Sequence, residues 1–132
     1  MTFTRGMVVL WTWPPSHTYK AMAQEIKNGE KMILVSGGPD FYFIVLAAVR
    51  YAIGRMTYAP SLVIEWCKTN RAALPDGIWR NIKEELDNEI RRDDRVRATG
   101  QEGCYPLGTN YDRASWISFR NWLAETFSLV DG

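Results

Sequence analysis

Two short apolar runs near the start of the chain are rich in β-branched residues and predict strands. They span residues 7–13, which two prolines end, and residues 31–35. Between them, apolar residues recur at helical spacing over 19–26, and Asn28-Gly29 suits a left-handed helix end. Residues 1–38 are therefore predicted to form a strand–helix–strand element, whose strands are parallel through a right-handed crossover or antiparallel.

Prolines and glycines mark the boundaries of the helices predicted after this element. A helix is predicted over 39–54, because Pro39-Asp40 suits a first turn and Gly54 suits an end. The next helix is predicted to begin at Pro60-Ser61 and to end before Pro75.

Two further helices are predicted from apolar stripes. One begins at residue 76 or 77, and the other runs over about 112–129. Residues 93–110 between them show no periodicity and contain three glycines and a proline, so a long loop is predicted there. The stripes consist of Ile78, Ile82, Leu86 and Ile90, and of Trp116, Phe119, Leu123 and Phe127.

The pattern as a whole predicts an α+β fold that is mostly α. We expect four or five helices with a small N-terminal two-stranded β element. The length of 132 residues suits one domain, 1–132, in which the element 1–38 joins a helical part, 39–132.

Charge and composition narrow the class of function. The chain has 16 basic and 15 acidic residues, which argues against a DNA mimic and makes direct nucleic-acid binding unexpected. Six tryptophans suit both a core and a binding surface. The longest apolar run is too short to span a membrane, and the chain opens without a secretory signal, so a cytoplasmic protein is expected.

Residue types that support catalysis or metal binding do not gather in the sequence. Cys67, Cys104 and His17 have no metal-ligand spacing, and Cys67 falls on an apolar stripe that predicts a buried thiol. Glu85 and Glu89 share a helix face, but neighbouring arginines favour a solvated surface there. We therefore expect no catalytic residues, no metal and no cofactor, and hence a protein that is not an enzyme.

A turn between a predicted strand and a predicted helix, Ser36-Gly37-Gly38, is a possible anion site. It lacks the lysine and hydroxyl residue of a phosphate-binding loop, and Asp40 follows it. A plain turn is therefore favoured.

The strongest candidate for a binding site is the stretch 50–58, where a helix is predicted to end. Its guanidinium groups could hold a phosphate or carboxylate, and its tyrosines could stack on a base. In the structural alternative, Arg50 pairs with an acid on a neighbouring helix and Arg55 caps its own helix. The candidate residues are Arg50, Tyr51, Arg55, Thr57 and Tyr58.

Two residues of the last predicted helix complete the candidate binding set. Asp112 and Trp116 are four positions apart, so they share one face. Asp112 could cap the helix or pair with Arg50 or Arg55, which would tie the stretch 50–58 to the C-terminal helix.

The run Arg50-Tyr51-Ala52-Ile53-Gly54-Arg55-Met56-Thr57-Tyr58 resembles an R-Y-A-[LI]-G-R-x-[ST]-Y motif of small proteins from phages, prophages and plasmids. The resemblance covers about residues 40–125 and includes the D-x-x-x-W pattern of Asp112 and Trp116. It implies an accessory role in mobile elements, including interference with bacterial defence, as anti-CRISPR proteins do.

Two functions are thus expected, ahead of a third and less favoured one, an enzyme that uses the acids near Glu85. The first is an inhibitor that occludes a protein surface of a host defence protein or ribonucleoprotein complex in the cytoplasm of a bacterial cell. The alternative is a protein that binds or sequesters a small ligand, such as a nucleotide signal, in an arginine and tyrosine pocket.

Overall fold

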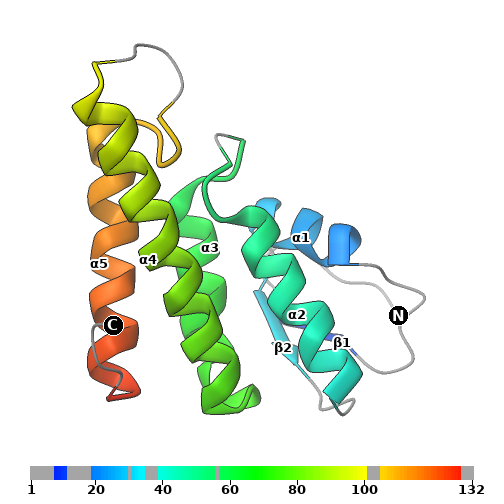
Figure 1. The fold of residues 1–132 in the computed structure, drawn as a ribbon. Helices are drawn as coiled ribbons and strands as arrows, with labels where there is room; N and C mark the ends of the chain where they lie inside the picture. Colours follow the sequence, from blue (N-terminus) through cyan, green and yellow to red (C-terminus); the bar gives the residue numbers. More distant parts are fainter. Residues whose placement is uncertain are drawn as a thin grey trace.

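The structure is a computed structural model that describes residues 8–11, 19–29, 31–34, 39–55, 57–100 and 105–128. Within these ranges the chain forms five α-helices, one short 3-10 helix and two short strands (Figure 1). The mostly helical class that the sequence predicts is confirmed. The elements are β1 (Val8–Trp11), α1 (Tyr19–Lys27), β2 (Lys31–Leu34), α2 (Pro39–Ala52), α3 (Pro60–Thr69), η1 (Arg71–Ala73), α4 (Asp76–Ala98) and α5 (Asn110–Thr126).

The two strands lie at the end of the molecule formed by the N-terminal elements. They run parallel, with Val8 opposite Lys31 and Trp11 opposite Leu34, and α1 connects them. The strand β2 packs against α3, so this element lies against the helical part of the chain.

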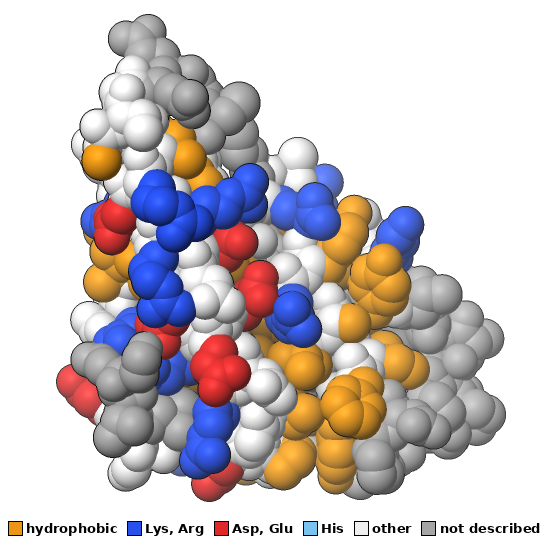
Figure 2. Space-filling model, viewed as in Figure 1, with side chains coloured by type: hydrophobic (Ala, Val, Ile, Leu, Met, Phe, Trp, Pro, Cys, Tyr) orange, Lys and Arg blue, Asp and Glu red, His pale blue; other side chains and the backbone are white. Residues whose placement is uncertain are grey.

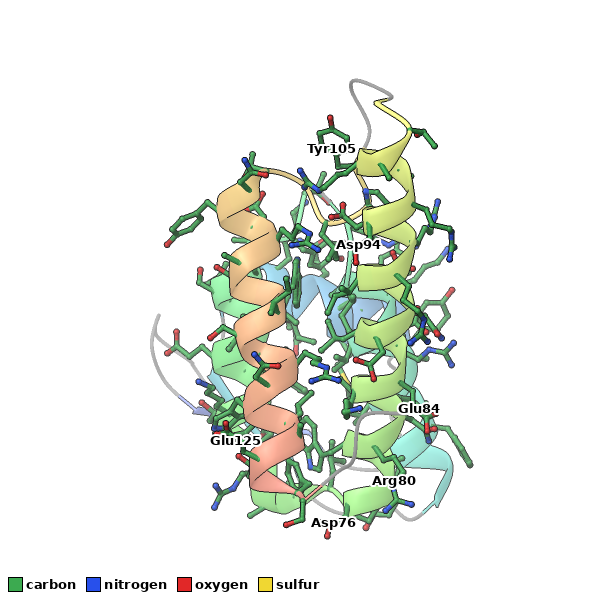
Figure 3. All side chains as sticks on the ribbon, turned by 60° about the vertical axis from the view of Figure 1, so that its left-hand side comes forward. Asp76, Arg80, Glu84, Asp94, Tyr105 and Glu125 are labelled. Atoms are coloured by element: carbon green, nitrogen blue, oxygen red, sulfur yellow. The ribbon has the colours of Figure 1, made fainter. Side chains whose placement is uncertain are left out.

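The helix α3 lies at the centre of the fold. It packs against α1 on one side and against α5 on the other, while α4 packs against both α2 and α5. The long helices α4 and α5 run side by side in opposite directions (Figures 1 and 3). Their shared core includes the large, fully buried side chains of Trp79, Ile82, Leu86, Phe119 and Leu123.

The helix ends follow the glycine and proline signals in the sequence. Gly29 follows α1 and Gly54 follows α2, both with φ of +77°, a backbone conformation that an L-residue rarely adopts. The helix α3 begins at Pro60, whose missing amide costs nothing at a first helical position. These three predicted boundaries are confirmed. The predicted end of the same helix before Pro75 is wrong, because α3 ends at Thr69 and the 3-10 helix η1 follows it.

The predicted loop over 93–110 is wrong in its first third. The helix α4 continues to Ala98. The sequence pattern did not predict this, because Asp93 occupies a core position that an apolar residue would normally fill. Asp93 is fully buried, and it accepts a hydrogen bond from Arg97 one turn later. A charged residue at a core position hides the helical period from a hydrophobicity pattern.

Cys67 is buried, as its stripe predicts, and burial raises the pKa of its thiol, which favours the neutral thiol over the thiolate. Cys104, His17 and the turn Ser36-Gly37-Gly38 lie outside the described residues. Among the residues described, no helix combines the length and apolarity that a membrane crossing requires.

Candidate functional site

A pocket of about 360 Å³ opens where the turn between α2 and α3 faces the segment before α5. We call it the α3–α5 pocket, since the first turns of both helices line it. Its lining consists of Gly54, Arg55, Thr57, Tyr58, Ala59, Pro60, Ser61, Pro106, Leu107, Gly108, Tyr111, Asp112, Ser115 and Trp116.

The structure brings five of the seven predicted binding residues to this pocket. Arg55, Thr57 and Tyr58 come from the α2–α3 turn, and Asp112 and Trp116 come from α5. The two groups lie more than fifty positions apart in the sequence, and they meet because α3 packs against α5.

The other two predicted residues do not line the pocket. Arg50 extends from α2 to α4, where its Nη2 lies 3.2 Å from Glu85 Oε2. This is the structural alternative expected for Arg50. The Tyr51 ring contacts the guanidinium of Arg55. It also packs edge-on against the ring of Tyr58, with ring centroids 6.2 Å apart. Tyr51 therefore supports the pocket residues without lining the pocket.

Arg55 is held in place by the end of its own helix. Its Nε donates a hydrogen bond to the Tyr51 carbonyl, and its guanidinium carbon lies 3.8 Å from the centroid of the Tyr51 ring. The predicted capping by Arg55 is thus present. Within the part of the chain that the structure describes, no group accepts a hydrogen bond from the two terminal nitrogens of Arg55. These nitrogens are available to a ligand.

Tyr58 is the buried member of the α2–α3 turn, with only 7% of its surface exposed. Burial raises the pKa of its hydroxyl, Tyr51 raises it further, and Arg55 lowers it. Lys27 from α1 lies 5.7 Å from the centroid of the Tyr58 ring. Tyr58 therefore remains a neutral phenol at physiological pH and fixes the turn against α1 and α2.

The first turn of α3 presents positive electrostatic potential to the pocket. Ala59 precedes the helix, and its methyl side chain cannot accept a hydrogen bond from the first-turn amides. Pro60 has no amide hydrogen. The amides of Leu62 and Val63 both turn back to the Ala59 carbonyl. Ser61 lines the pocket at this end of the helix dipole.

Asp112 supplies the negative charge of the pocket and is fixed by a capping box. Thr109 Oγ1 accepts a hydrogen bond from the Asp112 amide at 3.1 Å, and Asp112 Oδ2 accepts one from the Thr109 amide at 3.3 Å. The alternative in which Asp112 pairs with Arg50 or Arg55 is wrong, since Glu85 engages Arg50 and, among the described residues, no ion pair joins Asp112 to either arginine. Asp112 acts as the third residue of the helix, and Thr109 is the cap.

A group of charged residues that sequence reasoning missed holds the far wall of the pocket. We call it the Asp93 clasp, which comprises Asp93, Arg97 and Arg113. The buried Asp93 carboxylate accepts hydrogen bonds from Arg97 Nε at 2.6 Å, Arg113 Nε at 2.8 Å and the Leu107 amide at 3.1 Å. Arg113 also contacts Asp94, which lies with Tyr105 at this end of the α4–α5 pair (Figure 3).

The clasp keeps Asp93 ionised. Burial alone would raise the pKa of Asp93, but the hydrogen bonds from Arg97, the Leu107 amide and Arg113 outweigh burial and lower it. The signal that could have revealed the clasp is the four-residue spacing of Asp93 and Arg97, which suits an ion pair on one helix face.

The pocket has no arrangement that we interpret as catalytic. Among the described residues, no three His, Cys, Asp or Glu side chains gather to hold a metal ion. The paired carboxylates noted in the sequence, Glu85 and Glu89, do not line the pocket. Searches against known protein families, curated proteins and solved structures give no match to the chain.

Proposed function

We propose that the protein acts by binding and that the α3–α5 pocket takes a small nucleotide, held through Arg55. One observation supports this function above the others. An arginine and a carboxylate from different elements, Arg55 and Asp112, line one pocket, and each is fixed by its own helix without pairing with the other. A pocket with separated opposite charges suits a ligand that carries both an anionic group and hydrogen-bond donors.

The anionic group would lie beside Arg55. A guanidinium with two unengaged terminal nitrogens binds two oxygens of a phosphate at once. The open start of α3 at Ser61 adds the positive end of a helix dipole on the same side of the pocket. Thr57 supplies a hydroxyl beside Arg55.

The base would lie toward α5. Asp112 uses Oδ2 in its capping box, and its Oδ1 is available to accept a hydrogen bond from an amino group of a base. Tyr111 also lines the pocket, and 81% of its surface is exposed, so its ring is available for stacking. A volume of about 360 Å³ is near the lower end of ligand pockets, which favours a mononucleotide over a dinucleotide.

A thermal-shift panel tests this function. The panel contains nucleoside mono-, di- and triphosphates and cyclic mononucleotides, with the matching nucleosides and inorganic phosphate as controls. A ligand at 100 times its Kd stabilises the folded state by about 2.7 kcal/mol, which raises the melting temperature by several degrees. We expect at least one nucleotide to do so and its nucleoside to have a much smaller effect. A panel without any shift would refute the proposal.

A second candidate function is the inhibition of a bacterial defence complex by occlusion of a protein surface. Phe43 on α2 favours it, because 62% of this large apolar side chain is exposed. Figure 2 shows hydrophobic side chains gathered on the side of the molecule formed by α2, away from the mixed charges over α4. The motif resemblance to proteins of mobile elements also supports this function and a location in the bacterial cytoplasm.

Affinity purification from a bacterial lysate that contains a CRISPR effector separates the two candidates. An inhibitor should retain the effector, and Phe43→Ser should release it while Arg55→Ala does not. Retention that depends on neither residue, or the absence of the effector from the eluate, would exclude this surface as an inhibitory interface.

A further inference from the structure

The guanidinium of Arg97 on α4 contacts both its own helix and the segment before α5. Its Nε donates to Asp93 on the same helix, as described above. Its other two nitrogens reach the segment before α5: Nη1 donates to Asn110 Oδ1 at 3.0 Å and Nη2 donates to the Gly108 carbonyl at 2.7 Å. The guanidinium also lies 4.2 Å from the centroid of the Tyr105 ring.

These contacts are not needed to hold α4 and α5 together. Arg120 on α5 donates to Asp87 on α4 at 2.7 Å, and Arg113 on α5 donates to Asp93 on α4. The apolar core between the two helices adds to these links. What Arg97 adds is the attachment of residues 105–110, which form one wall of the pocket and lead into the Asp112 capping box.

We infer that Arg97 is a positioning residue of the α3–α5 pocket. It holds the pocket wall at residues 106–108 in the conformation that binds the ligand. The inference rests on the proposed function for its ligand-binding consequence. A wall that is fixed before binding spares the ligand the cost of ordering it. Arg97 achieves this because one rigid planar fork reaches a carboxylate, a side-chain amide and a carbonyl at the same time.

The variant Arg97→Lys is the sharpest test, because it keeps the charge beside the buried Asp93 and removes the fork. A lysine ammonium cannot reach all three acceptors in the same geometry. The matched control is Arg95→Lys, which makes the same exchange on an exposed residue of the same helix. Asn110→Ala is a milder second variant, since it removes one acceptor and leaves Asp93 paired with Arg97 and Arg113.

Amide hydrogen exchange gives a readout that needs no ligand. The Leu107 amide is buried and donates to Asp93 Oδ1, so its exchange reports the opening of the wall. In Arg97→Lys we expect this amide to exchange at least about tenfold faster, while core amides of Leu86 and Leu123 keep their rates. Asn110→Ala should accelerate exchange by a smaller factor, and Arg95→Lys should leave it unchanged.

The same variants are then titrated by calorimetry with every nucleotide of the thermal-shift panel, beginning with the one that shifts the wild-type melting temperature most. Weaker binding by about tenfold in Arg97→Lys, with wild-type affinity in Arg95→Lys, supports the inference in full. Faster Leu107 exchange together with no nucleotide binding even by the wild-type chain supports the role of Arg97 in the wall and refutes the proposed function. Unchanged Leu107 exchange in Arg97→Lys overturns the inference, whether or not a nucleotide binds.

Discussion

The guanidinium of Arg55 lies over the ring of Tyr51, the residue one helical turn before it, with 3.8 Å between the guanidinium carbon and the ring centroid. The same arginine donates through Nε to the Tyr51 carbonyl. Tyr51 therefore holds the charged group that we propose to bind a phosphate through two contacts, one from its ring and one from its carbonyl. Tyr51, which the sequence predicts as a binding residue, does not line the pocket and instead contacts Arg55, which does.

Replacing the aromatic ring of Tyr51 should therefore weaken nucleotide binding, although Tyr51 does not line the pocket. Tyr51→Leu removes the ring against which Arg55 lies, and we expect about a twofold to thirtyfold increase in Kd, since a cation–π contact contributes about 0.5–2 kcal/mol. Tyr51→Phe keeps the ring and should bind as the wild type does. Calorimetric titration of both variants checks this, and equal weakening in the two would show that the hydroxyl matters instead of the ring.

The capping box of α5 should make a measurable contribution to stability. Thr109→Ala removes the side-chain acceptor of the Asp112 amide, and loss of such a cap costs about 1 kcal/mol of the free energy of unfolding. We expect a melting temperature lower by about 4 °C. Thr69→Ala, at the exposed end of α3, is the control and should change stability by less than about 0.5 kcal/mol. Urea denaturation of both variants gives the two free energies.

Gly108 should be the least replaceable glycine of the pocket. Its φ of +76° disfavours any side chain, and an added Cβ would lie 2.7 Å from Asp112 Oδ2. Gly108→Ala should lower the free energy of unfolding by at least about 1–2 kcal/mol and disturb the capping box. Gly77→Ala is the matched control, since α4 leaves open space there, and it should stabilise the protein by up to about 1 kcal/mol. An equal effect of the two substitutions would contradict the described backbone.

Glu89 should make stability depend on pH in the opposite direction from Asp93. Burial raises the pKa of Glu89, the nearby Glu85 and Asp93 raise it further, and Arg92 lowers it, so the net shift is upward from 4.5. The folded state therefore disfavours the ionised Glu89, and a penalty appears as the pH rises above the unfolded value. We expect Glu89→Gln to melt at a higher temperature than the wild type at pH 7 and at the same temperature at pH 3.5. A lower melting temperature of the variant at pH 7 would show that the carboxylate stabilises the fold.

The sequence predicted the helices well where backbone conformation decides the boundary. Gly29 and Gly54 end helices because each adopts a positive φ, and Pro60 begins one because a first-turn residue needs no amide. These effects are local and therefore visible in a single sequence. The sequence did not predict the end of α4, since the buried position at Asp93 is filled by a carboxylate whose partners lie four, fourteen and twenty residues later.

The candidate site was predictable in its residue types and less so in its geometry. The spacing of Arg50, Tyr51 and Arg55 identified a polar helix end, but it could not tell which arginine turns toward α4 and which toward α3. Glu85 on α4 pairs with Arg50, whereas Arg55 lines the pocket. The meeting of Arg55 with Asp112 depends on the packing of α3 against α5, a long-range property that spacing does not encode.

The central claim is that Arg55 holds the anionic group of a nucleotide in the α3–α5 pocket. Isothermal titration calorimetry of the wild type, Arg55→Ala and Arg50→Ala with the nucleotide that gives the largest thermal shift tests it most directly. The two arginines lie on neighbouring turns of the chain, and only Arg55 lines the pocket. We predict that Arg55→Ala weakens binding by at least about tenfold, which corresponds to about 1.4 kcal/mol, and that Arg50→Ala binds within about twofold of the wild type. Wild-type affinity in Arg55→Ala, or an equal loss in Arg50→Ala, would contradict the claim.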